Sequence, residues 1–369
     1  MATIKIKQGN CLEVLKELPK QSVNTCVTSP PYWGLRDYGT AEWEGGDESC
    51  DHTSAKEKSR YDYKMQEGSR HSEIAKTTKG TDQARWKDQC PDCGAIKRDM
   101  QLGLEETPEE YVENMVKLFR EVRRVLRDDG TLWLNLGDSY ARTPNSQISQ
   151  GGLCASKNDH LKYEYQHKKD YGNVIKPKDL VGIPWMVAFA LRADGWYLRQ
   201  DIIWHKPNPM PESVKDRCTK AHEYIFLLSK SKKYYYDHVA IKEDGVIKAG
   251  TRGAKGSIER QKIKGVNARP PEYKVYDGKR NKRSVWTVTT KPFKGAHFAV
   301  FPMDLIEPCV LAGCPEGGTV LDPFGGSGTT GLVAKQNKRN AVLIELNPKY
   351  IDIAEDRIKS TFMQSCLDI

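Results

Sequence analysis

The sequence has no long hydrophobic run. Hydrophobic residues make up 38% of its 369 residues, and no stretch approaches the ~18 consecutive apolar residues that a membrane-spanning helix needs. The opening segment, MATIKIKQGN, has no apolar stretch of the kind that directs secretion. We therefore expect a cytoplasmic protein without a membrane partner.

Internal repeats are also absent, which argues against a solenoid, a collagen or a coiled coil. The chain has ten cysteines, but without a secretion signal they are expected to be reduced thiols or metal ligands and not a disulfide framework. Four lie in apolar patterns and are expected in the core: Cys11, Cys26, Cys309 and Cys314. At roughly 150 residues per domain, the length predicts about two domains or one domain with insertions.

Positive charge is concentrated in one part of the chain. The formal net charge is +9, yet residues 231–294 carry 17 Lys and Arg against 6 Asp and Glu. This basic window also contains several aromatic residues: Tyr234, Tyr235, Tyr236, Tyr273, Tyr276 and Trp286. A basic stretch interleaved with aromatic residues suits a nucleic-acid backbone. The alternative is a solvated insertion that has no partner.

Apolar strands alternate with amphipathic helices along most of the chain. Strands are expected at 3–7, 22–28, 131–140, 196–207, 222–230, 318–322 and 340–344, and helices at 11–19, 107–130, 184–195, 303–314, 329–336 and 350–360. The longest helix opens with Thr107 as N-cap, Pro108 and Glu110, which is the capping-box pattern. The alternation predicts an α/β fold with a mainly parallel sheet.

A glycine-rich loop follows one expected strand. Gly326–Gly331 matches G-x-G-x-x-G and opens a helix, whose N-terminal N–H groups are available to a ligand. Glu345 ends the next strand, where a carboxylate can bind both hydroxyls of a ribose. These features suit a dinucleotide and S-adenosylmethionine about equally. Asp322 favours S-adenosylmethionine, because the α-ammonium group of this cofactor needs a carboxylate partner. A purely structural turn is the remaining alternative.

A second motif, Thr28-Ser29-Pro30-Pro31-Tyr32, follows the strand at 22–28. The two prolines fix the backbone and aim the Ser29 hydroxyl and the Pro30 carbonyl at one point. Two acceptors there would draw the amino group of a nucleobase toward tetrahedral geometry, which frees its lone pair for methyl transfer. The aromatic ring of Tyr32 suits stacking on a base flipped out of a duplex. Taken alone, the motif is also compatible with an ordinary turn.

Together the two motifs resemble the DNA amino-methyltransferases, which methylate N4 of cytosine or N6 of adenine. Because Ser-Pro-Pro-Tyr precedes the cofactor loop by about 290 residues, the order resembles the circularly permuted β group of that family. The resemblance covers roughly residues 3–38 and 104–360. It implies a Rossmann-like methyltransferase fold, S-adenosylmethionine as cofactor and double-stranded DNA as partner. It also implies a restriction-modification context and a homodimer.

The resemblance assigns roles to individual residues. The catalytic residues would be Ser29, Pro30, Pro31 and Tyr32, and Ser29 favours cytosine because adenine enzymes usually have Asp or Asn there. N6-adenine stays open as the alternative. The cofactor-binding residues would be Asn10, Asp322, Phe324, Gly326, Ser327, Gly328, Thr329, Thr330 and Glu345. Other hypotheses are an RNA or protein methyltransferase, a nicotinamide enzyme and a non-catalytic DNA-binding protein.

The polar segment at 39–103 contains four candidate metal ligands: Cys50, His52, Cys90 and Cys93. The C-x-x-C-G unit is typical of a zinc knuckle, and a small insertion without a core can take its folding energy from a metal. A structural zinc is therefore expected, and the alternative is four unrelated reduced side chains. The chain would divide into a catalytic half (1–38 and 104–230), the insertion (39–103), a target-recognition region (231–294) and a cofactor-binding half (295–369).

Overall fold

The computed structural model describes residues 2–34, 40–57, 85–86, 89–141, 175–245, 277–290 and 301–367. At its centre is an eight-stranded sheet of order β1-β14-β13-β2-β7-β9-β8-β12. The strands are β1 (Ile4–Gln8), β14 (Asn340–Glu345), β13 (Thr319–Asp322), β2 (Val23–Thr28), β7 (Leu126–Leu136), β9 (His222–Ser229), β8 (Tyr197–His205) and β12 (Val285–Thr287). Only β9 runs antiparallel to its neighbours. The predicted α/β fold with a mainly parallel sheet is confirmed.

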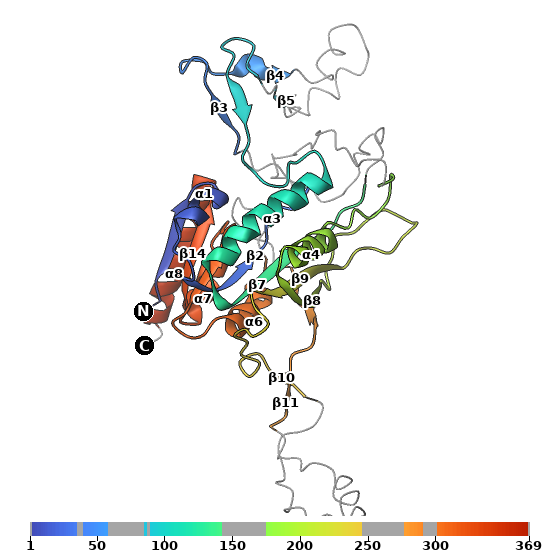
Figure 1. The fold of residues 1–369 in the computed structure, drawn as a ribbon, viewed down its shortest axis with the longest axis vertical. Helices are drawn as coiled ribbons and strands as arrows, with labels where there is room; N and C mark the ends of the chain where they lie inside the picture. Colours follow the sequence, from blue (N-terminus) through green and yellow to red (C-terminus); the bar gives the residue numbers. More distant parts are fainter. Residues whose placement is uncertain are drawn as a thin grey trace, which may run out of the picture.

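Helices cover both faces of the sheet (Figure 1). On one face lie α1 (Cys11–Glu17), α3 (Pro108–Val125) and α4 (Ile183–Ala193). On the other face lie α6 (Met303–Gly313), α7 (Thr329–Gln336) and α8 (Pro348–Leu367). Successive strand residues point to opposite faces, so Leu132 and Leu134 of β7 join one hydrophobic core while Trp133 joins the other.

The longest predicted helix begins as expected but ends earlier. The Thr107 hydroxyl accepts a hydrogen bond from the Glu110 amide at 3.1 Å, which confirms the cap. The predicted end at Gly130 is wrong, because the helix ends at Val125. The backbone is extended at Leu126, and this buried residue pairs with Val23 of β2. The strand register then shifts, so residues 127–130 form an irregularity at the start of β7.

Two smaller structures project from opposite ends of the molecule (Figure 1). One is formed by the insertion and contains the antiparallel pairs β3 (Glu42–Glu44) with β6 (Ile96–Arg98) and β4 (Lys56–Glu57) with β5 (Arg85–Trp86), and the 3-10 turn Thr53–Ala55. The other is the two-stranded ribbon of β10 (Glu243–Asp244) and β11 (Lys279–Arg280). The ribbon belongs to the basic window.

Part of the basic window belongs to the central sheet. Trp286 lies on the edge strand β12 and is 6% exposed, with its indole N–H donated to the Arg283 carbonyl at 2.7 Å. The prediction that it contributes to a surface for nucleic acid is therefore wrong for Trp286. Tyr236 packs its ring near that of Trp133, with centroids 6.2 Å apart. Tyr273 and Tyr276 lie outside the described residues.

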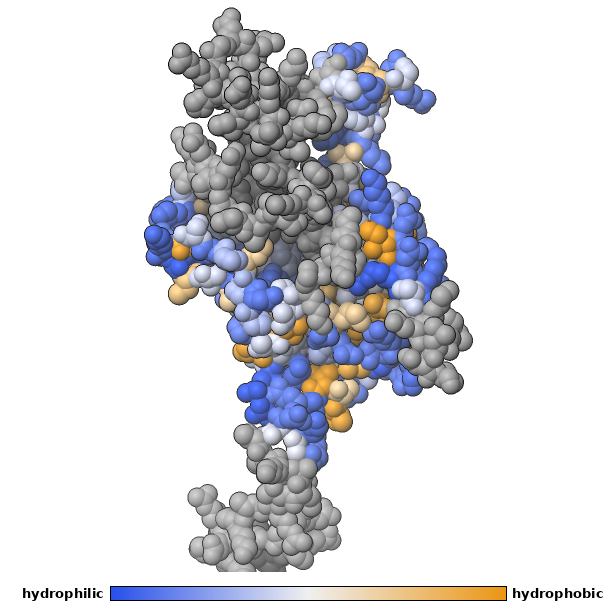
Figure 2. Space-filling view, turned by 180° about the vertical axis from the view of Figure 1, so that it is seen from behind, coloured by the Kyte–Doolittle hydropathy of each residue, from blue (hydrophilic) through white to orange (hydrophobic). Residues whose placement is uncertain are grey.

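Three of the four cysteines expected in the core are buried, namely Cys26, Cys309 and Cys314. Cys11 is half-buried, and burial raises the pKa of its thiol to about 12. Among the residues coloured in Figure 2, hydrophilic ones dominate and hydrophobic ones form small separate groups. Within the described part of the chain, none of the helices combines the length and apolar character needed to span a bilayer.

Candidate active site

The site lies along the edge of the sheet where the parallel strands end. The strands β14, β13, β2 and β7 reach this edge at Glu345, Asp322, Thr28 and Leu136. The antiparallel strand β9 starts there, which brings Glu223 to the same edge. In open α/β sheets ligands bind at the carboxyl ends of the strands, so these residues mark the candidate site.

Asp322 joins the two predicted motifs. Its Oδ1 accepts hydrogen bonds from the Thr28 hydroxyl at 2.6 Å and the Phe324 amide at 3.0 Å. Its Oδ2 accepts one from the Thr330 hydroxyl at 2.6 Å. Asp322 is 1% exposed, and this burial raises the pKa of its carboxyl group, although the three hydrogen bonds oppose the rise. The carboxylate thus fixes the residue before Ser29 against the glycine-rich loop.

Glu345 is the second carboxylate of this region. Its Oε2 accepts a hydrogen bond from the Gly326 amide and its Oε1 accepts one from the Asn347 amide, both at 2.8 Å. Burial raises the pKa of Glu345, and the charge of Asp322 raises it further. Two neighbouring carboxylates give the region a negative potential. A cationic ligand is favoured there and an anionic one is repelled.

The glycine-rich loop packs closely against α8. A Cβ at Gly328, which has φ +78°, would lie 2.8 Å from the Ala354 Cβ. Arg357 of α8 donates hydrogen bonds to the Ser327 carbonyl at 2.5 Å, the Ser327 hydroxyl at 2.6 Å and the Thr329 hydroxyl at 3.2 Å. Arg357 was not predicted, because nothing local in the sequence signals a contact that depends on how α8 packs.

Asn10, which the sequence predicted only as a cofactor contact, is the N-cap of α1. Its Oδ1 accepts hydrogen bonds from the amides of Leu12 at 2.9 Å and Glu13 at 3.4 Å, so it caps α1. The preceding Gly9 amide donates to the Glu345 carbonyl at 3.0 Å. Asn10 therefore lies next to Glu345 in space, and its contact with an adenine ring stays a prediction.

The Tyr32 hydroxyl is held in a network of polar side chains. The Ser29 hydroxyl donates to the Tyr32 oxygen at 3.4 Å, and the Tyr32 oxygen lies 2.8 Å from Glu223 Oε2 and 3.1 Å from Asn135 Oδ1. Lys206 forms an ion pair with Glu223. Burial and then the charge of Glu223 raise the pKa of Tyr32, so the phenol stays protonated and donates to the carboxylate.

The backbone of the loop Ser29–Tyr32, called the catalytic loop after its predicted role, is held from several sides. The Tyr111 hydroxyl of α3 donates to the Pro31 carbonyl at 2.9 Å. A Cβ at Gly103, which has φ +94°, would lie 3.0 Å from the Tyr32 carbonyl oxygen. A Cβ at Gly137 would lie 2.6 Å from the ring of Tyr32. These contacts give the loop one conformation and leave no room for larger residues at either glycine.

Sequence reasoning missed Glu223 and Asn135 as parts of the site. For the loop at 204–209, which contains Lys206 and ends an expected strand, the sequence left two interpretations open, a lining of the target-base pocket or a plain rigid loop. Lys206 follows β8 and Glu223 begins β9, and the pairing of these strands brings the two together. The Lys206 ammonium also lies 4.2 Å from the centre of the Trp204 ring. The only signal in the sequence was that Lys206 and Glu223 flank expected strands.

The four predicted metal ligands also come together, but in the insertion and not at the edge of the sheet. The ligand atoms of Cys50, His52, Cys90 and Cys93 all lie within 4.8 Å of one another. The segment at 297–302, whose sequence resembles the stretch that precedes the cofactor loop in the amino-methyltransferases, falls mostly outside the described residues.

Comparison with known proteins places the chain in a family. The family model N6_N4_Mtase, described as DNA methylase, matches residues 23–356. The type II methyltransferase M.Cfr9I of Citrobacter freundii is 40% identical over 352 residues, which is 95% of this chain and 86% of that protein. M.SmaI of Serratia marcescens is 40% identical over 361 residues, covering 97% and 91%.

A solved structure supports the fold. The structure titled PvuII DNA methyltransferase (cytosine-N4-specific) matches with a TM-score of 0.53 and 17% identity, covering 96% of this chain and 87% of that chain. This likeness confirms the predicted methyltransferase fold. The Ser-Pro-Pro-Tyr loop precedes the glycine-rich loop in the chain, as the predicted permuted order requires. The chain belongs to the DNA methylase family of the N6/N4 type.

Proposed function

We propose that this chain transfers a methyl group from S-adenosylmethionine to the N4 amino group of cytosine in double-stranded DNA. The observation that carries the proposal is the hydrogen-bonded bridge from Thr28 through Asp322 to Thr330. It ties the loop suited to amino-group chemistry to the loop suited to the cofactor. Family membership supports DNA as the substrate.

The residues present suit S-adenosylmethionine. Two of its charged groups, the α-ammonium and the sulfonium, are cations, and the buried carboxylates of Asp322 and Glu345 favour cations. A dinucleotide would bring a pyrophosphate dianion to the same carboxylates, which argues against a nicotinamide enzyme. When bound, S-adenosylmethionine supplies a methyl group that is activated by the positively charged sulfur.

The catalytic loop would act on the amino group of the target base. The Ser29 hydroxyl and the Pro30 carbonyl accept hydrogen bonds from its two hydrogens, which directs the lone pair toward the methyl carbon. As the nitrogen–carbon bond forms and the carbon–sulfur bond breaks, the nitrogen becomes positively charged. Both acceptors stabilise that charge, and one amino proton then leaves to solvent. Tyr32 stacks on the flipped base.

Two features support the choice of substrate. Ser29 occupies the position where family members that methylate cytosine usually have serine, so N4-cytosine is favoured over N6-adenine. The basic window supplies the positive charge that a DNA backbone requires. The predicted homodimer stays a prediction.

The experiment is nucleoside mass spectrometry. The purified chain is incubated with S-adenosylmethionine and unmethylated double-stranded DNA of mixed sequence, and the DNA is then digested to nucleosides. N4-methylcytosine is the expected product. N6-methyladenine would overturn the choice of base and keep the enzyme class. If the cofactor binds but neither product forms, an RNA or protein substrate replaces DNA in the proposal, and parallel reactions with RNA and peptide acceptors identify it.

A further inference from the structure

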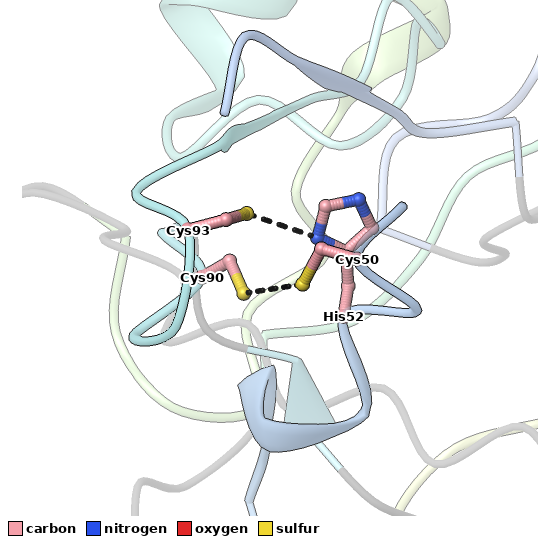
Figure 3. Close-up of side chains that lie close together, drawn as sticks. All are labelled: Cys50, His52, Cys90 and Cys93. Carbon is pink, nitrogen blue, oxygen red and sulfur yellow. Dashed lines mark hydrogen bonds between the residues drawn. The ribbon is translucent and has the colours of Figure 1, made fainter. Parts of the chain in front are cut away.

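The insertion contains a compact cluster of soft metal ligands (Figure 3). Cys50 and His52 come from one loop, and Cys90 and Cys93 come from the facing loop. The thiol of Cys50 points toward that of Cys90, and the thiol of Cys93 points toward the His52 ring. Methyl transfer uses none of these side chains.

Two distances in this cluster match the edges of a tetrahedral zinc site. The Cys50 and Cys90 sulfurs are 3.8 Å apart, and the Cys93 sulfur is 3.6 Å from His52 Nδ1. Zinc bonds of about 2.3 Å to sulfur and about 2.0–2.1 Å to nitrogen give tetrahedral edges of about 3.8 Å between sulfurs and about 3.6 Å between sulfur and nitrogen. Three thiols and one imidazole form a common structural zinc ligand set.

The backbone around the ligands is shaped for this arrangement. The Cys90 amide donates to the Ala95 carbonyl at 2.8 Å, and the Gly94 amide donates to the Cys90 carbonyl at 2.9 Å. This tight turn points both thiols of the C-x-x-C unit the same way. At Gly46, a Cβ would lie 2.7 Å from the Cys93 sulfur. The glycine therefore leaves room for that sulfur in its present position.

His52 is oriented by its neighbours. It has φ +54°, in the left-handed region that a residue with a side chain rarely adopts. Its ring stacks on that of Trp43, with centroids 4.6 Å apart and planes 20° apart. The stacking turns Nδ1 toward the Cys93 sulfur.

Among its described residues, the insertion has very little hydrophobic core of its own. Its buried hydrophobic cluster consists of Ala55, Cys90 and Ala95, with Trp43, Cys50 and Cys93 packed against it. Half of these side chains are candidate ligands. Burial of so few apolar groups gives little of the free energy needed to order a segment of this size. Another source of folding energy is required, and metal binding supplies it in small modules.

We infer that Cys50, His52, Cys90 and Cys93 hold one structural Zn²⁺ ion that folds the insertion. The donor set fills four positions and leaves none for water or substrate, so the ion has no part in methyl transfer. Binding of Zn²⁺ releases the three thiol protons to solvent and forms three zinc–sulfur bonds and one zinc–nitrogen bond. This inference does not depend on the proposed base or cofactor.

The first test measures metal content. The full chain, purified without chelators, is analysed by plasma mass spectrometry, and one zinc per chain is expected. Cys90→Ser should lose the zinc, while the matched control Cys218→Ser, which alters an exposed cysteine outside the cluster, should keep it. Iron in place of zinc, no metal, or a disulfide between Cys50 and Cys90 found by peptide mapping would each overturn the inference.

The second test does not depend on whether Cys90→Ser folds. Zinc is removed from the wild-type chain and Co²⁺ is added, and tetrahedral thiolate coordination is expected to give intense visible and near-ultraviolet absorption bands. His52→Cys should keep tetrahedral binding with a shifted spectrum. Limited proteolysis should cut the metal-free chain within residues 40–101 and leave the remainder intact. Cleavage that is the same with and without zinc would overturn the structural role of the ion.

Discussion

At the scale of single residues, the Ser29 hydroxyl has a role in the proposed mechanism that no neighbouring group duplicates. Ser29→Ala is expected to lower kcat by about 10²–10³-fold, because one acceptor for the charged transition state is lost. Cofactor affinity should stay unchanged, since Thr28 and not Ser29 binds Asp322. Single-turnover kinetics and calorimetry measure the two quantities. The exposed Ser22, at the opposite end of β2, provides the control Ser22→Ala. Equal losses in turnover and affinity would contradict a catalytic role.

Glu223 is a positioning residue for Tyr32. Glu223→Gln keeps the side-chain shape but removes the charge that pairs with Lys206 and orients the Tyr32 hydroxyl. We expect kcat to fall by roughly tenfold and the protein to be destabilised by roughly 1–3 kcal/mol, because the half-buried Lys206 loses its partner.

A double variant separates the two effects of Glu223. Adding Lys206→Met to Glu223→Gln should recover thermal stability without recovering kcat, since the unpaired ammonium is gone but Tyr32 remains unoriented. Glu212→Gln is the matched control, because Glu212 forms a similarly exposed ion pair, with Arg217, that includes neither Glu223 nor Lys206. If activity returns together with stability, Glu223 serves only to stabilise the fold.

The raised pKa of Glu345 predicts opposite effects of pH on binding and folding. Cofactor binding requires the carboxylate, so affinity should weaken as the pH falls through a folded-state pKa above the ordinary 4.5. The contribution of Glu345 to stability has the opposite sign. Its pKa is higher in the folded state, so this contribution is complete below the ordinary value and is lost as the pH rises through the folded-state pKa.

Calorimetry with S-adenosylmethionine from neutral pH down through the ordinary glutamate pKa of 4.5 tests the prediction. The wild type should lose affinity across this range. Glu345→Gln should bind weakly throughout and show a smaller pH dependence, which attributes the titration to this residue. A wild-type affinity that does not change over the range would show that the Glu345 carboxylate is not required for binding.

At the scale of elements, the C-terminal end of the insertion contacts the residues that directly follow Tyr32. The Gly34 amide donates to the Gly103 carbonyl and the Trp33 indole to the Glu105 carbonyl, both at 2.9 Å. Gly103→Ala would place a Cβ 3.0 Å from the Tyr32 carbonyl oxygen. We expect kcat to fall and cofactor affinity to be kept, because the catalytic loop shifts and the glycine-rich loop does not.

Gly317→Ala is the control for backbone strain. Gly317 also has a positive φ, at +76°, but no other part of the described chain lies within 4 Å of the position that a Cβ would take there. Both substitutions should lower the free energy of unfolding by about 1 kcal/mol or more, because each puts a residue with a side chain in the left-handed backbone region. Only Gly103→Ala adds a clash with the catalytic loop. Similar kinetics for both variants would mean that strain alone explains the effect.

Local signals made several elements predictable. The cap at Thr107, the glycine-rich turn and the alternating strands are determined by neighbouring residues, and the structure contains all of them. The end of α3 was misplaced because Leu126 leaves the helix to pair with Val23, about 100 residues earlier in the chain. The contacts of Glu223 and Arg357 depend on strand order and helix packing, so no local pattern indicates them.

At the scale of the whole molecule, one sheet combines the two predicted halves. β1 from the N-terminal segment pairs with β14 from the C-terminal segment, and β13 pairs with β2. The cofactor loop and the catalytic loop therefore cannot separate without opening the sheet. The basic window joins this sheet through β12 and also contacts β7 through Tyr235 and Tyr236, while its ribbon extends away from the sheet (Figure 1). This arrangement would separate the chemistry from the DNA-binding region proposed for the basic window.

The charges of the ribbon are largely compensated within it. Lys242 pairs with Asp277, Lys279 with Asp244, and both Arg280 and Arg283 with Glu243. By contrast, the sequence from 246 to 276 contains eight Lys and Arg against two Asp and Glu. In the sequence, most of the net positive charge of the basic window therefore lies in that stretch.

Replacing those eight basic residues by Gln should weaken DNA binding and reduce its dependence on salt. Each phosphate contact that is lost makes the slope of log K against log salt concentration less negative by about 0.9. The cofactor affinity should not change, because Asp322 and Glu345 lie at the edge of the sheet. The control Lys242→Gln with Asp277→Asn removes one ion pair and keeps the net charge, and it should bind DNA as the wild type does. If the substituted stretch leaves the salt slope unchanged, the DNA backbone is bound elsewhere and the basic window is a solvated insertion.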